Sequence, residues 1–144
     1  MLKHQVIMFI INVIIGITLN PMNLLAYRFN DLYLSLTLFY GSLTMASNMI
    51  WSHEIIKFIV YKKFNLQFFL LGVTLLIIVT FIMRKQLLVN DEQYLRRMIS
   101  HHSTALTTSH KILEKTNNKK LKKLAKDIID TQEREINMMK KMLK

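Results

Sequence analysis

The stretches that decide the fold are YLRRMISHH at residues 94–102 and TQEREINMM at residues 131–139. Each lies in a longer segment whose apolar residues recur every three or four positions, which is the pattern of an amphipathic helix. A short polar break, Lys115-Thr-Asn-Asn118, separates the two segments, and neither contains Gly or Pro. Residues 87–144 are therefore predicted to form a helical hairpin.

The ends of the two helices carry their own signals. Asn90 or Asp91 can cap the first helix, and Gln93 follows Asn90 at the spacing of a capping box. That helix is expected to run to about Glu114, and the second helix to run from Lys119 to the end of the chain.

Polar residues lie inside the apolar stripe of the first helix. His102 falls at its centre, and Met98 lies one turn earlier on the same side. His101 falls at one edge of the stripe and His110 on the opposite flank. Only His102 is expected to point squarely inward.

The second helix has the same property. Gln132 and Glu135 fall within its apolar stripe, within two turns of Met139. An unpaired carboxylate in such a place is costly, so a partner is expected to satisfy it.

Two interpretations of these residues remain open. In the first, Glu135 or Gln132 pairs with His102 in a buried hydrogen-bond cluster that fixes the register of the helices. In the second, the side chains bind a metal ion. The chain has no Cys, which excludes thiolate sites and disulfides. Imidazole with thioether suits copper(I) or another soft ion, whereas His with Glu suits zinc, copper(II) or iron, and copper is preferred.

A two-helix hairpin buries its inner faces poorly by itself. Dimerisation into a four-helix bundle is the economical solution, and it would bring two copies of the polar set together. The chain is accordingly expected to form a homodimer or a higher homo-oligomer.

Three long runs without formal charge precede the hairpin, at residues 5–27, 32–52 and 65–83. Each approaches the roughly 20 residues that span a bilayer, so residues 1–86 are predicted to be a membrane domain with three transmembrane helices. The first run is interpreted as an uncleaved anchor because it is long and lacks an Ala-x-Ala-like cleavage site. The whole chain is thus predicted to be all-α and integral to a membrane.

The formal net charge of +11 lies mostly outside these runs. Such charge favours contact with anionic lipid headgroups, while nucleic acid is not expected because no binding motif accompanies it. A small excess of lysine beside the amino terminus and the loop after the second run predicts that these face the cytoplasm. The carboxy-terminal domain would then be extracytoplasmic.

The two polar blocks resemble a known family, the domain-of-unknown-function family 305. Its first block, a Met, two residues and then His-His with a downstream Ala, reads here Met98-Ile-Ser-His101-His102-Ser-Thr-Ala105. Its second block is matched by Gln132, Glu135-Ile136 and Met139. The chain departs from the family at Ser100, where members often have Pro, and at Ser109 or His110, where another Met is common.

The resemblance implies a ferritin-like bundle, commonly facing outside the cytoplasm, with some relatives linked to copper or silver. The expected function is membrane-anchored, non-enzymatic metal binding through Met98, His101, His102, Glu135 and Met139, with Gln132 and His110 around them. The alternative is an interaction module whose polar residues specify dimerisation without metal. A metal-dependent oxidase is disfavoured because the hairpin has no Glu-x-x-His motif.

Overall fold

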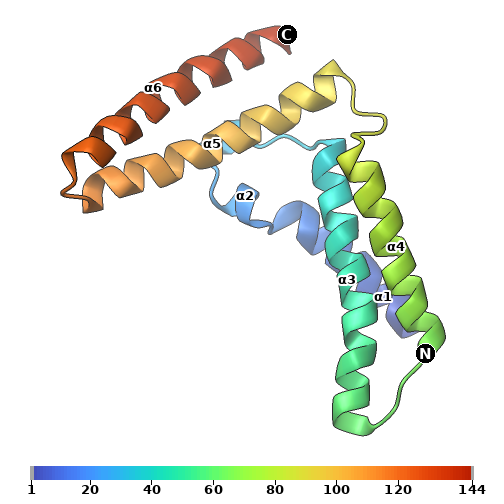
Figure 1. Cartoon of the computed structure of the whole chain (residues 1–144). Coiled ribbons are helices and arrows are strands. Elements are labelled where there is room, and N and C mark those ends of the chain that lie inside the picture. Colours follow the sequence, from blue (N-terminus) through green and yellow to red (C-terminus); the bar gives the residue numbers. More distant parts are fainter. Residues whose placement is uncertain (1, 144) are drawn as a thin grey trace. The chain divides into compact units, whose positions relative to one another are not determined.

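The computed structural model describes residues 2–143, and within that range it contains helices and no strands (Figure 1). The all-α prediction is confirmed. The helices are α1 (Leu2–Thr18), α2 (Pro21–Leu24), the 3-10 helix η1 (Phe29–Asp31), α3 (Leu36–Tyr61), α4 (Leu66–Arg84), α5 (Asp91–Lys115) and α6 (Lys119–Met142).

The described chain forms two compact units. The first contains residues 2–18 and 36–88, and the second contains residues 19–35 and 89–143. In the first unit α3 packs against both α1 and α4. In the second, α5 and α6 lie side by side as an antiparallel hairpin (Figure 1).

Two glycines allow the helices of the first unit to approach closely. A Cβ atom on Gly16 would lie 2.8 Å from Cβ of Ser42, and one on Gly72 would lie 2.7 Å from the backbone nitrogen of Trp51. Small residues at these positions therefore bring α1 and α4 into backbone contact with α3.

A buried carboxylate joins the same three helices at one end of the unit. Glu54 of α3 is fully buried and accepts hydrogen bonds from Gln5 Nε2 at 3.2 Å and from the backbone nitrogen of Asn65 at 3.0 Å. Lys57 Nζ lies 2.8 Å from Glu54 Oε2 and forms an ion pair with it. Because α1, α3 and the N-cap of α4 all contribute to this cluster, it fixes how the helices align.

Two stretches are long and apolar enough to cross a membrane, Leu2–Leu24 and Leu66–Arg84. The prediction of three apolar spans is corrected on this point, because α3, which contains residues 36–52 of the predicted span at residues 32–52, does not qualify. The prediction rested on the lack of charged residues in that run and did not take into account its many Ser, Thr and Asn residues. Several of its hydroxyl groups are turned inward, since Ser42 and Ser47 are buried.

The second unit begins its long helices as the sequence predicts. Asn90 Oδ1 accepts a hydrogen bond from the backbone nitrogen of Gln93 at 2.9 Å, and Asn118 caps α6 in the same way. The break between Lys115 and Lys119 matches the predicted turn. Local capping chemistry therefore sets these boundaries.

Residues 19–35, here called the strap, connect α1 to α3 and include α2 and η1. The sequence analysis assigned them to the membrane domain, whereas in the structure they cluster with the hairpin. Tyr33 of the strap packs against the core of that unit, which consists of Ile99, Leu106, Ile136 and Met139.

Candidate functional site

Two serines of α5 hold the backbone of the strap. Ser100 Oγ donates to the carbonyl oxygen of Asp31 at 2.8 Å and accepts from the backbone nitrogen of Tyr33 at 3.1 Å. Ser103 Oγ donates to Asp31 Oδ2 at 2.7 Å and accepts from the backbone nitrogen of Tyr27 at 2.8 Å. Each hydroxyl thus donates and accepts at once, which satisfies strap groups that would otherwise be buried unpaired.

Ion pairs connect the strap to α6. Asp31 is fully buried and pairs with Lys140 Nζ, while Arg28 forms a two-pronged ion pair with Glu133. The hydrogen bond that Arg28 donates to Glu133 raises the pKa of the Arg28 guanidinium above its ordinary value. The exposed Arg28 pair contributes little to stability, whereas the buried Asp31 pair is costly to break.

Sequence reasoning missed the strap. A signal was present, because Ser100 and Ser103 lie one turn apart on the face of α5 away from His102. Small hydroxyl residues at this spacing are typical of close approach by another backbone. Nothing in the sequence identified that backbone as residues 19–35.

His110 also belongs to the strap contact. Its ring stacks on Tyr27 with centroids 4.7 Å apart and planes 13° from parallel. This contact places His110 in the strap interface.

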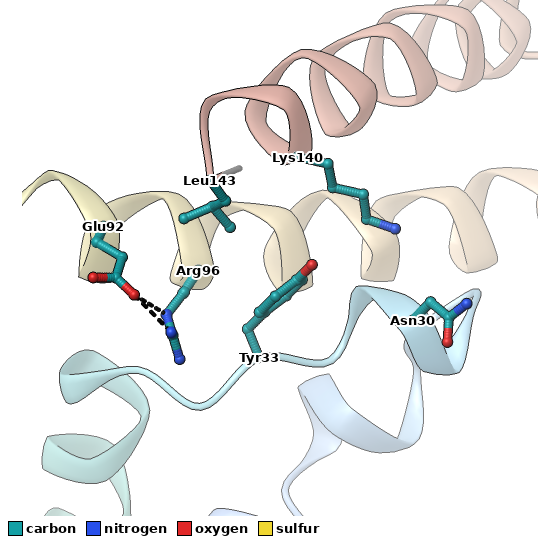
Figure 2. A pocket seen from close by; sticks show the side chains of 6 residues that line it. All are labelled: Asn30, Tyr33, Glu92, Arg96, Lys140 and Leu143. Atoms are coloured by element: carbon teal, nitrogen blue, oxygen red, sulfur yellow. Dashed lines mark hydrogen bonds and ion pairs between the residues drawn. The ribbon is translucent and has the colours of Figure 1, made fainter.

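A pocket of about 310 Å³ opens between the strap and the hairpin ends (Figure 2). Its lining residues are Asn30, Tyr33, Glu92, Arg96, Lys140 and Leu143. The charges around it are already paired, since Arg96 binds Glu92 and Lys140 binds Asp31. We assign this pocket no ligand.

The structure does bring His102 and Glu135 together. His102 Nδ1 lies 3.1 Å from Glu135 Oε2, from α5 to α6. The side chain of His102 is 13% exposed, and its Nδ1 is buried and has no hydrogen bond, since the angles toward Glu135 do not suit one. The ring nitrogen is therefore a buried polar group whose hydrogen-bonding capacity is unused, although a carboxylate lies beside it.

The environment of His102 favours the neutral form of its imidazole. Burial lowers the pKa of His102 below its ordinary value and outweighs the opposing effect of Glu135, while His101 lowers it further. A neutral imidazole is the form that binds a metal ion.

The remaining predicted residues are placed unevenly around this pair. Met139 is buried in the core of the hairpin, and Met98 packs against that core. Gln132 is half-buried. His101 is exposed, with its ring centroid 6.0 Å from that of His102.

Among residues 2–143, no three His, Asp or Glu side chains gather in a group that could hold a metal ion. The donors that do converge are an imidazole and a carboxylate, and the two thioethers belong to the same core. These donors match in part those that a borderline or soft metal ion prefers. The best-supported ligand among them is Nδ1 of His102, which is buried and has no hydrogen bond.

Comparison with known proteins identifies a family through the segment that contains the hairpin. The model of the family described as domain of unknown function (DUF305) matches residues 84–144. The chain is also 37% identical over 128 residues to uncharacterized protein L153 of Acanthamoeba polyphaga mimivirus, an alignment that covers 87% of this chain and 82% of that protein. The chain belongs to the DUF305 family.

Likeness to the viral relative extends well beyond the hairpin, because an alignment that covers 87% of this chain reaches into the first unit. No solved structure matches the chain. The DUF305 segment contains α5 and α6 but leaves out the strap.

Proposed function

We propose that this DUF305 protein is a membrane-anchored, non-enzymatic metal-binding protein that handles copper. The observation that carries the proposal is the pair of His102 and Glu135, in which a buried, unbonded imidazole nitrogen lies 3.1 Å from a carboxylate oxygen. Its chemistry is that of an ion-binding group held in the neutral state.

The roles follow from position. His102 supplies the imidazole and Glu135 the carboxylate, while Met98 and Met139 supply thioethers from the adjoining core. His101 lies at the exposed edge, where it can receive an ion from solvent. Gln132 supports the site from α6, and His110 is assigned to the strap instead.

Anchoring is supported by two apolar stretches of the chain. Leu2–Leu24 and Leu66–Arg84 are strongly apolar, yet only 17% and 11% of their most apolar windows are buried. A helix that is apolar on its exposed faces is suited to lipid. On this proposal the net charge of +11 also attracts anionic headgroups, and the hairpin lies outside the cytoplasm.

A second candidate function is an interaction module in which His102 and Glu135 specify pairing of the hairpin with a second copy, without metal. The observation that favours it is the pair itself, because such polar groups within an apolar interface fix register. Both proposals expect a homodimer that completes a four-helix bundle.

The test is a copper(I) titration of the full chain in detergent, in competition with a chelator of known affinity. A His102→Asn variant is expected to bind roughly tenfold or more weakly, and Met98→Leu to bind more weakly with its packing retained. His110→Asn is the matched control, because His110 contacts Tyr27, and it should bind as the parent chain does.

Two results would decide against copper. Equal affinity in the parent chain and the His102→Asn variant would place the ion elsewhere. Absence of binding, with an intact dimer that His102→Asn dissociates, would favour the interaction module.

A further inference from the structure

The first unit contains a second pair of imidazoles, remote in sequence from the hairpin. His4 of α1 and His53 of α3 lie edge to face, with ring centroids 5.8 Å apart. They lie at the end of the unit where α3 turns into α4. We propose that His4 and His53 bind a divalent transition-metal ion of the zinc type.

The separation of the rings suits a shared ion. A nitrogen ligand lies about 2.0 Å from zinc, so the ring centroid lies about 3.2 Å from it. Two imidazoles on one ion then have centroids roughly 5 to 6.4 Å apart, from tetrahedral to linear geometry. The observed 5.8 Å falls inside that interval.

One nitrogen of the pair has nothing else to bind. His53 Nδ1 is buried and has no hydrogen-bond partner. Beside it in the fold, Gln5 is 5% exposed, and its Oε1 is also buried without a partner. Unsatisfied polar atoms of this kind are rare in folded proteins, and one on a paired imidazole with another beside it indicates a ligand.

The pair is held in place by its neighbours. Gln5 follows His4, and Glu54 follows His53, and the Gln5 amide donates to Glu54 at 3.2 Å. This hydrogen bond fixes α1 against α3 directly beside the histidines. The pair is therefore organised by the fold, which lowers the cost of binding.

The donor set defines the chemistry. No third His, Asp or Glu completes a group among residues 2–143, so water fills the remaining positions. Imidazole nitrogen without thiolate suits zinc, copper and nickel. With two protein ligands the site is labile, as suits an ion that passes through.

The test uses the full chain in detergent with His101 and His102 both changed to Asn, so that it does not depend on the hairpin. Zn²⁺ is expected to raise the thermal midpoint of this chain, because a ligand that binds only the folded state stabilises it. The rise should disappear in His4→Asn and in His53→Asn. Lys3→Gln is the matched control and should retain it.

A second measurement counts the ligands directly. Cu²⁺ is bound in place of Zn²⁺ to the chain in which His101 and His102 are Asn. Electron spin-echo spectroscopy is expected to detect two imidazoles on the copper in that chain and one after His4→Asn or His53→Asn is added. Helical circular dichroism confirms that the variants fold. Equal midpoint shifts in all chains, no shift in any, or an unchanged imidazole count would overturn the proposal.

Discussion

At the scale of single residues, Asp31 joins three elements of the second unit. Its carboxylate meets Lys140 of α6 and Ser103 of α5, and its carbonyl oxygen meets Ser100. The hydroxyl group of Ser100 is what makes this contact.

Asp31→Ala is expected to destabilise the second unit by about 3 kcal/mol, because it leaves Lys140 and Ser103 without their buried partner. Hydrogen exchange of α5 and α6 amides measures the loss. Asp130→Ala, at an exposed position on α6, is the control and should change stability by less than about 0.5 kcal/mol.

Ser100→Ala and Ser103→Ala separate the two backbone contacts. The first should speed exchange of the Tyr33 amide and the second that of the Tyr27 amide, since each serine accepts one of these hydrogen bonds. Thr108→Ala, at an exposed position on α5, should alter neither amide. Uniform acceleration along the strap in both variants would contradict this division.

His102 makes stability depend on pH in a defined direction. Its pKa is lowered in the folded chain, so the unfolded chain binds more protons as the pH falls below about 6.5. The metal-free second unit should therefore be less stable at pH 5.5 than at pH 7.5. His102→Asn should reduce that difference, measured by denaturation, and His101→Asn should reduce it in part, because His101 also lowers the pKa of His102.

At the scale of elements, close approach governs the first unit. Gly72 admits no side chain, because a Cβ atom there would meet the backbone of Trp51. Gly41 has open space around its Cβ position.

Gly72→Ala is therefore expected to destabilise α3–α4 pairing by about 1–3 kcal/mol through overpacking. Gly41→Ala should stabilise α3 by up to about 1 kcal/mol, because alanine favours a helix. Thermal unfolding in detergent compares the two. If the thermal midpoints of both variants shifted in the same direction, close packing at Gly72 would not explain the effect of Gly72→Ala.

Some elements were predictable because their causes are local. The caps at Asn90 and Asn118 act within three residues, and the stripe that places His102 opposite Glu135 repeats along each helix. The strap contacts join residues 67 to 109 positions apart, and no local pattern encodes them. The predicted second span failed because charge alone was counted, without the polar hydroxyl and amide groups.

At the scale of the whole molecule, the hairpin and the strap form one folding unit from separate parts of the sequence. A fragment of residues 86–144 should accordingly be less protected from hydrogen exchange than the same residues in the full chain. A peptide of residues 19–35 added in trans should restore protection, and an Asp31→Ala peptide should not. Equal protection with and without the peptide would show that the hairpin folds independently.

The distance along the chain between Asp31 and Lys140 also sets an order of events during synthesis. The two residues are 109 positions apart. At a ribosomal rate of about 5–20 residues per second, the strap emerges roughly 5 to 20 s before the lysine that neutralises its carboxylate. In that interval the ribosome synthesises α3, α4 and α5, which lie between the two residues in the chain. The last turns of α6, rather than the first appearance of the hairpin, therefore complete the second unit as the chain leaves the ribosome.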